Sequence, residues 1–361
     1  MELNKRSQIA AICTIFVVFS LMGWYKGKML FALPPFPALL NTSFENSTVV
    51  QIGSFKTSMA VLSIVDMAFR DPVDSSKVAI KRRMLNPDRQ EIYVSELQLA
   101  VPENITAMNP FDTSQLTPDY EKLEVAARPL IAPPFAVGSL LSNVDAKSDV
   151  LIIGLGGSQM NNYLHYKYPK MNITIAELEA TVVEMARKYF GLQEDKTQRV
   201  FVMDGLELLQ KAAKEGRQFD AVYIDACPTR YPYDVEIMCP VPIFLEDSNI
   251  ELIRKVLRET GSLVLKVLIF SWDVEDKAEK LADKYRKYFA NCAILDMVTP
   301  QNRVMACSRE GISKKLYEVA ALAANTTKFY KGVGLIDEEC CNFDVNECCI
   351  IYHENATAMA L

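Results

Sequence analysis

The chain has 361 residues, half of them hydrophobic and 23% charged, which is enough for about two domains with their own cores. Its formal net charge of −6 gives no reason to expect nucleic acid as a partner. Only two histidines, His165 and His353, are present, which argues against a histidine-based catalytic triad or a histidine-rich metal site.

The amino terminus begins with an uncharged, mostly apolar stretch, Ile9–Tyr25, which follows two basic residues and ends in two aromatic ones. This pattern is typical of a short membrane span and predicts a signal anchor within residues 1–30. A cleaved signal peptide, which would leave a secreted protein, is the alternative. Residues 31–48 are rich in Pro, Ser and Thr and are expected to form a stem.

Six Asn-x-Ser/Thr sequons occur, where roughly two would arise by chance. We therefore expect a single-pass membrane protein whose body is lumenal or extracellular. Asn172 abuts an expected core strand and is left out of the predicted glycan sites. The predicted sites are Asn41, Asn46, Asn104, Asn325 and Asn355, all but Asn104 in segments expected to be linker or tail.

Residues 49–135 contain runs with strand character and are predicted to form a small β-rich domain. The clearest run, Glu91–Leu99, alternates polar and apolar residues as a half-buried strand does. Val49–Gly53 and Val78–Arg83 are similar. Prolines at 129, 133 and 134 mark the approach to a larger domain over residues 136–310.

The apolar run Asp149–Ile153 breaks into Gly154, Gly156 and Gly157 where a helix can begin. Glycines at such a turn let a nucleotide-like ligand lie against bare backbone, although they also serve simple tight connections.

Three later strand-like runs each end in an acidic residue, giving Glu177, Asp204 with Gly205, and Asp225. Ligands of open α/β sheets bind at the carboxyl ends of the strands, where a carboxylate such as Glu177 can accept hydrogen bonds from a ribose diol. Asp204 can accept from an adenine amino group. Each acid taken alone also fits a helix cap or a solvated loop residue.

These runs resemble the successive motifs of class I S-adenosylmethionine-dependent methyltransferases, in the spermidine-synthase-like branch. The matching segments are Gly154-Leu-Gly-Gly157, Ala176-Glu-Leu-Glu179, Val202-Met-Asp-Gly205 and Phe219-Asp-Ala-Val-Tyr-Ile-Asp225. Met238-Cys-Pro-Val-Pro-Ile-Phe244 is similar to a signature of the translation elongation factor methyltransferases. The resemblance covers roughly residues 85 to 310 and implies S-adenosylmethionine as cofactor, with its methionine part held by the glycine turn.

Two positions depart from the pattern. Ile153 stands where many methyltransferases have an acid, which puts cofactor affinity in doubt. Spermidine synthases have Asp-x-x-Asp after the fourth strand, but Asp225-Ala-Cys-Pro228 has proline at the second acid. Aminopropyl transfer is therefore disfavoured, although Asp234 could substitute for the missing acid.

The pattern predicts a doubly wound α/β fold with a seven-stranded Rossmann-like sheet, preceded by the small β domain and the anchor helix. Strands are expected at Ser262–Ile269 and, as a closing antiparallel pair, at Cys292–Met297 and Arg303–Cys307. Helices are expected at Glu179–Phe190, Ile243–Glu259, Val274–Phe289 and Ile312–Ala324.

Residues 311–361 are expected to form that last helix and a cysteine-rich tail. Four tail cysteines are disulfide candidates in an oxidising compartment, with Cys227, Cys239, Cys292 and Cys307 as further partners. Their spacing does not fit a common zinc site. The four are Cys340, Cys341, Cys348 and Cys349.

Three functions are compatible with these patterns. The first is a methyltransferase of the secretory pathway that acts on an unknown protein or small molecule, with Asp225 as the catalytic candidate. The second is a catalytically inactive protein that uses the nucleotide fold for binding or structure. The third is aminopropyl transfer. A homodimer is compatible with each of them.

Overall fold

The computed structural model describes residues 47–71, 76–86, 89–103, 105, 112–124, 126–228, 235–297, 299 and 301–335. Within these residues, no helix is long and apolar enough to cross a membrane. The predicted anchor, four of the five predicted glycan sites and the four tail cysteines lie outside the described residues.

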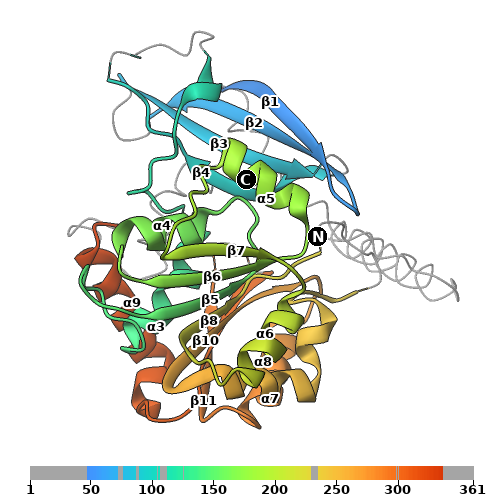
Figure 1. Cartoon of the computed structure of the whole chain (residues 1–361), viewed down its shortest axis with the longest axis vertical. Helices are drawn as coiled ribbons and strands as arrows, with labels where there is room; N and C mark the ends of the chain where they lie inside the picture. Colours follow the sequence, from blue (N-terminus) through green and yellow to red (C-terminus); the bar gives the residue numbers. More distant parts are fainter. Residues whose placement is uncertain are drawn as a thin grey trace, which may run out of the picture.

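The amino-terminal part is an antiparallel sheet of four strands in the order β1-β2-β3-β4. The strands are β1 (Thr48–Lys56), β2 (Val61–Arg70), β3 (Val78–Asn86) and β4 (Arg89–Gln98). Figure 1 shows this sheet packed across the top of the larger one. The expectation of β structure here is met. Strand β2 was not anticipated, because most of its residues are buried on both faces and the apolar–polar alternation is lost.

The larger sheet follows the order β11-β12-β10-β8-β5-β6-β7, with the short β9 paired to β10. Strands β5, β6, β7, β8 and β10 run parallel, whereas β12 is antiparallel to both β10 and β11. The sheet is thus mixed and has eight strands where seven were expected. Their bounds are Asp149–Ile153 (β5), Asn172–Glu177 (β6), Gln198–Val202 (β7), Phe219–Ile224 (β8), Ile237–Cys239 (β9), Leu257–Ile269 (β10), Asn291–Asp296 (β11) and Asn302–Ser308 (β12).

Helices cover both faces of this sheet, as expected for a doubly wound fold. Two separate apolar cores result, one under α3, α4, α5 and α9, and one under α6, α7 and α8. The helices are α3 (Arg128–Ala136), α4 (Gln159–Lys167), α5 (Ala180–Tyr189), α6 (Gly205–Lys214), α7 (Asp247–Val256), α8 (Val274–Arg286) and α9 (Val319–Gly332), with short 3-10 turns η1 (Thr113–Gln115), η2 (Pro242–Leu245) and η3 (Lys314–Tyr317).

Pro133 and Pro134 lie inside α3, where the burial of both rings stabilises a helix that their propensity disfavours. Two expectations about helices are wrong. The helix expected to reach Glu259 ends at Val256, where β10 begins. Asn325 lies within α9, not in a tail.

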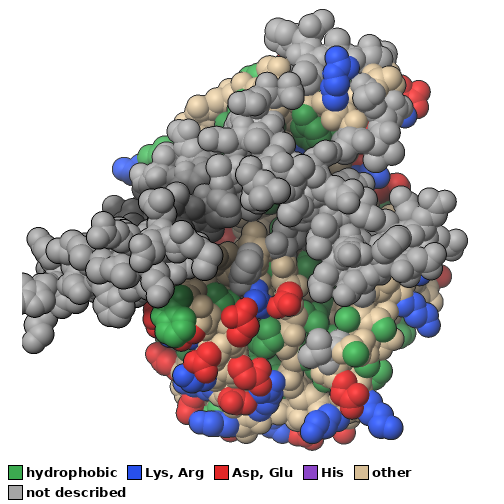
Figure 2. Space-filling model, turned by 180° about the vertical axis from the view of Figure 1, so that it is seen from behind, with side chains coloured by type: hydrophobic (Ala, Val, Ile, Leu, Met, Phe, Trp, Pro, Cys, Tyr) green, Lys and Arg blue, Asp and Glu red, His purple; other side chains and the backbone are tan. Residues whose placement is uncertain are grey.

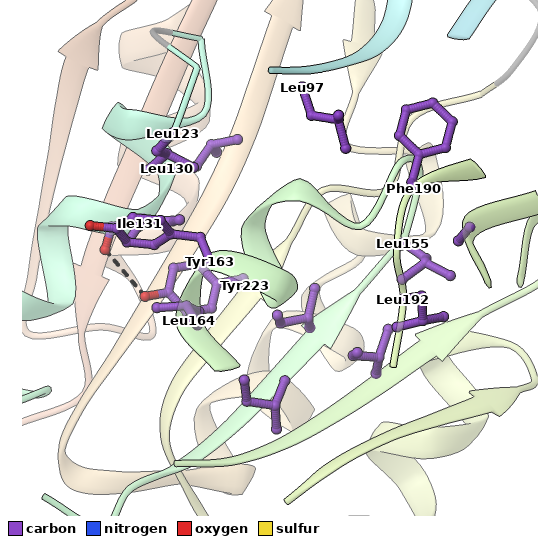
Figure 3. Close-up of a cluster of buried hydrophobic side chains, with 14 of the residues drawn as sticks. Leu97, Leu123, Leu130, Ile131, Leu155, Tyr163, Leu164, Phe190, Leu192 and Tyr223 are labelled. Carbon is purple, nitrogen blue, oxygen red and sulfur yellow. Dashed lines mark hydrogen bonds between the residues drawn. The ribbon is translucent and has the colours of Figure 1, made fainter. Parts of the chain in front are cut away.

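The small sheet is joined to α5 by a hydrogen bond from a buried arginine and by apolar packing. Arg82 of β3 binds Asp66 of β2 through two hydrogen bonds of 2.7 and 2.8 Å. Its guanidinium also donates to the carbonyl of Tyr189 at 2.7 Å, at the end of α5. Leu97 of β4 belongs to the same core as Phe190, as Figure 3 shows. The small sheet therefore rests on α5 and on the turns beside it.

Candidate functional site

The carboxyl ends of four parallel strands are tied together by backbone hydrogen bonds. The amide of Gly154 donates to Ala176 at 2.9 Å, that of Met203 to Glu177 at 3.0 Å, and that of Asp225 to Ile153 at 2.9 Å. The glycine turn, Glu177, Asp204 and Asp225 accordingly follow one another along a single edge of the sheet. The glycine turn follows β5, and Asp225 follows the neighbouring strand β8. Open α/β sheets bind ligands in a crevice outside this edge.

The glycines of the turn meet different surroundings. A side chain on Gly154 (φ +95°) would come within 2.4 Å of the Asp225 carbonyl, so only glycine fits between β5 and β8. A side chain on Gly157 would meet Ser95 of β4 at 2.5 Å. Gly156 (φ +51°) instead faces open space, with nothing within 4 Å. The backbone at Gly156 is therefore the part of the turn that a ligand can approach.

Leu155 points away from this open side into the core. Figure 3 shows its side chain between Phe190 and Leu192. The next residue after the glycines, Ser158, has left-handed backbone (φ 57°) and precedes α4. Its hydroxyl is buried and has no hydrogen-bond partner within the described chain.

Glu177 is 8% exposed, and each of its carboxylate oxygens accepts one backbone N–H. Leu155 donates to one oxygen at 3.0 Å and Glu179 to the other at 2.9 Å. Burial raises the pKa of the Glu177 carboxyl, and the N–H groups of Glu179 and Leu155 oppose that rise. Each oxygen retains a second lone pair, so the group can still accept from a ligand.

The side chain of Glu179 reaches the small sheet. It accepts from the amide of Ser58 at 3.1 Å and from the Ser58 hydroxyl. Ser58 lies in the β1–β2 hairpin, so this hairpin is held beside the end of β6.

Asp204 is exposed and caps α6, since its side chain accepts from the amide of Leu206 at 2.7 Å. The helix-cap role, which the sequence allowed for this acid, is thus present in the structure. Gly205 is required here because a side chain on it would come within 2.4 Å of the Ile153 side chain. Ile153 is buried against this turn.

Two exposed apolar residues flank these acids, and the sequence patterns did not reveal them. Leu178, directly after Glu177, is 67% exposed, and Val202, paired with Glu177 across the strands, is 53% exposed. The sequence signal that could have revealed them is an apolar residue at the end of a strand, where polar residues are usual.

Asp225 is paired with a lysine. Its carboxylate lies 3.3 Å from the ammonium of Lys266 on β10. The Cys227 sulfur is 3.8 Å from the same carboxylate, and Cys227 forms a disulfide with Cys239 of β9. Tyr223 points away from the edge, and its hydroxyl donates to the carbonyl of Ile131 in α3 (Figure 3). Asp234, the possible substitute for the missing second acid, lies outside the described residues.

A second disulfide joins Cys292 of β11 to Cys307 of β12. Cys227, Cys239, Cys292 and Cys307 thus pair with one another and not with the tail cysteines, as one of the open possibilities had them. The reason is register, since Cys292 and Cys307 stand directly opposite on antiparallel strands. Among the residues that the structure describes, no group of three or more His, Cys, Asp or Glu is arranged to hold a metal ion.

The surface around the larger sheet carries charges of both signs. Figure 2 shows Lys and Arg beside Asp and Glu over the lower half of one face. Pairs on helix surfaces include Lys280 with Asp276 at 2.7 Å. His165 lies at the opposite edge of the sheet, beside Thr197 and Asp195 ahead of β7, and so takes no part in the site.

Comparison with known proteins gives a consistent result. The profile of the spermine/spermidine synthase domain matches residues 137–308. The eEF1A lysine and N-terminal methyltransferase homolog of Drosophila melanogaster is 27% identical over 166 residues, which is 46% of this chain and 24% of that protein. The match thus spans about a quarter of the curated relative.

Two further matches concern aminopropyl transfer. The polyamine aminopropyltransferase of Vibrio vulnificus is 32% identical over 82 residues, covering 23% of this chain and 27% of that protein. A probable spermidine synthase from Corynebacterium glutamicum has the same fold, with a TM-score of 0.51 at 15% identity over 77% of this chain and 87% of that one. Residues 137–308 thus match the spermine/spermidine synthase domain, and this match together with the methyltransferase relatives supports a class I methyltransferase domain of the spermidine-synthase-like branch.

Proposed function

We propose that this protein is an S-adenosylmethionine-dependent methyltransferase. The observation that carries the proposal is the alignment of an open glycine turn, Glu177, Asp204 and Asp225 along one sheet edge. When bound, S-adenosylmethionine supplies an electrophilic methyl group on a sulfonium. The protein's contribution to such chemistry is placement and exclusion of water rather than a set of diagnostic catalytic side chains.

The residues at the edge fit an adenosyl ligand. Gly156 leaves its backbone uncovered, and both Glu177 oxygens keep acceptor capacity toward a ribose diol. Asp204 is exposed and can accept from an adenine amino group while it caps α6. Leu178 and Val202 offer exposed apolar surface beside these acids, which an aromatic base could cover. Asp225, beside the glycine turn, is the candidate to orient the acceptor.

Two observations bear on the alternatives. Ile153 is buried against Gly205, so no carboxylate lies at that place to assist cofactor binding, which favours a catalytically inactive binding protein. Asp225 is already paired with Lys266, and Pro228 replaces the second acid of the aminopropyltransferases. Aminopropyl transfer therefore has the least support.

Calorimetric titration of the purified, disulfide-bonded protein separates these functions. We expect S-adenosylmethionine to bind more tightly than decarboxylated S-adenosylmethionine. The opposite preference would indicate an aminopropyltransferase. Absence of heat with either compound would favour the inactive alternative. Glu177→Ala is expected to abolish binding, whereas Glu194→Ala, which removes another acid of the same domain, is the matched control.

We further propose that the protein is anchored in a secretory-pathway membrane with its body in the lumen or outside the cell. The sequons and the apolar amino terminus support this location, and so do two disulfides, which persist in oxidising compartments. The name of the Drosophila relative points to protein acceptors, and we leave the acceptor of this chain as an unidentified protein or small molecule.

Endoglycosidase treatment of the protein expressed in animal cells tests the location. A downward gel shift is expected, and an unshifted band would place the body in the cytosol. Asn172 is not expected to carry a glycan, because its side chain donates to Asp149 at 2.6 Å and accepts from Arg199 at 2.9 Å.

A further inference from the structure

Lys266 is an unusual residue for its position. It lies in the middle of β10, between Leu265 and Val267, both of which are fully buried. Its side chain is 25% exposed. An ammonium group loses hydration in such a place, so it requires compensating partners. The neighbouring strands make this part of β10 the centre of the sheet.

The compensation that Lys266 receives is incomplete. Its ammonium lies 3.3 Å from Asp225, at ion-pair distance, and within the described chain it donates no hydrogen bond to another group. An ammonium has three N–H donors. The Asp225 side chain is itself 32% exposed, so the pair is partly open to solvent at this edge of the sheet.

The Lys266–Asp225 pair is also held beside the glycine turn. The Asp225 amide donates to Ile153, and the Asp225 carbonyl packs against Gly154. A cation with spare donors thus lies at the end of β8, beside the glycine turn. A negatively charged oxygen group complements those donors, whereas a protonated amine would have to displace Lys266 from Asp225.

We propose that Lys266 is a carboxylate-binding residue of this site. The inference rests on the proposed function in that it concerns the same crevice. Two sources have the required chemistry: the methionine carboxylate of S-adenosylmethionine, and a carboxylate on the methyl acceptor. Decarboxylated S-adenosylmethionine lacks the first, and N-acetylglycine is a minimal probe for the second.

The test is calorimetric titration of the wild-type protein and of Lys266→Met. If the cofactor is the source, Lys266→Met weakens S-adenosylmethionine binding about ten- to a hundred-fold and leaves decarboxylated S-adenosylmethionine unchanged. If the acceptor is the source, both cofactor affinities stay within about twofold. N-acetylglycine binding to the protein saturated with S-adenosylhomocysteine is then weakened by the same ten- to hundred-fold factor, and N-acetylglycinamide does not bind.

Two variants guard against a general loss of structure. Lys277→Met removes a lysine of similar exposure that pairs with Glu236 at 2.9 Å, and it should change neither affinity. Asp225→Asn should strengthen carboxylate binding, because Lys266 loses the negative charge that competes for it. A purely structural ion pair predicts no such gain.

The proposal is overturned if Lys266→Met leaves every affinity within about twofold of wild type, or if Asp225→Asn weakens carboxylate binding. Absence of heat from S-adenosylmethionine with the wild-type protein would refute the proposed function instead. N-acetylglycine titrated without cofactor, into wild type and Lys266→Met, still decides the carboxylate site in that case.

Discussion

The buried pair Asp66–Arg82 should contribute more to stability than any surface ion pair of this protein. Both side chains are about 1% exposed, and two hydrogen bonds join them. Asp66→Asn keeps the shape of the side chain and removes its charge. Arg82 then remains buried as a cation with only carbonyl partners, those of Tyr189 and Thr113.

The expected loss of unfolding free energy is about 3–5 kcal/mol, which is typical when one partner of a buried ion pair is removed. A matched control is Asp145→Asn, which removes the exposed partner of Lys170. That change should stay within about 0.5 kcal/mol of wild type. Because Arg82 links the small sheet to the end of α5, the loss should affect the whole cooperative transition and not only the small sheet.

Guanidinium unfolding followed by circular dichroism measures both variants. Arg82→Met should be similarly destabilising, and the double variant should cost clearly less than the sum of the single ones, with a coupling of at least ~2 kcal/mol. A loss below about 1 kcal/mol for Asp66→Asn, or additive single effects, would show that water reaches the pair and that our account of its burial is wrong.

Three further predictions address the site, the pH response and the disulfides. Gly154→Ala and Gly138→Ala both place alanine at positive φ, but only the former meets a backbone carbonyl, at 2.4 Å from the new side chain. Gly154→Ala should therefore lower the unfolding free energy by at least ~1 kcal/mol more than Gly138→Ala and abolish S-adenosylmethionine binding. Equal losses in urea unfolding would contradict the close approach of Gly154 to the Asp225 carbonyl. Desolvation acts to raise the pKa of Asp195, but hydrogen bonds from Thr197 and Gln198 outweigh it and lower that pKa from 3.8 to about 2. The stability that the ionised Asp195 contributes is present above pH 3.8 and is lost as the pH falls toward 2. Because half of this side chain is exposed, the contribution should be less than about 1 kcal/mol. The unfolding free energies of wild type and Asp195→Asn, measured by urea titration, should therefore converge near pH 2, and a constant difference between them would refute the assignment. Replacing Cys292 and Cys307 by serine removes a crosslink between residues 15 apart and should lower the unfolding free energy by about 3 kcal/mol. Guanidinium unfolding with and without reductant measures this loss. If reductant still destabilises the variant, the effect comes from Cys227–Cys239 instead.

The sequence was most informative where strands end. The apolar runs before Gly154, Glu177 and Asp225 are buried on both faces, so their hydrophobicity marked them as central parallel strands. Alternating strands and helices then determined which ends share an edge. The strand bounds were accordingly predicted to within a few residues.

Other features depend on contacts that no local pattern encodes. Helix α3 contains three prolines, two of them in its interior, and forms because it packs against α9 and β10. Strand β9 has three residues and is too short for a periodic signal. The Lys266–Asp225 pair joins residues 41 positions apart, and the exposure of Leu178 follows from where β6 ends.

The small sheet also has a practical consequence for dissecting this protein. Ser95 packs on the glycine turn and Ser58 binds Glu179, so the wall of the crevice comes partly from residues that precede the family-matched segment 137–308. A fragment cut at that boundary would expose the apolar side chains around Phe190 to solvent. Expression of the matched segment alone should therefore give aggregated material, and useful truncations begin ahead of β1.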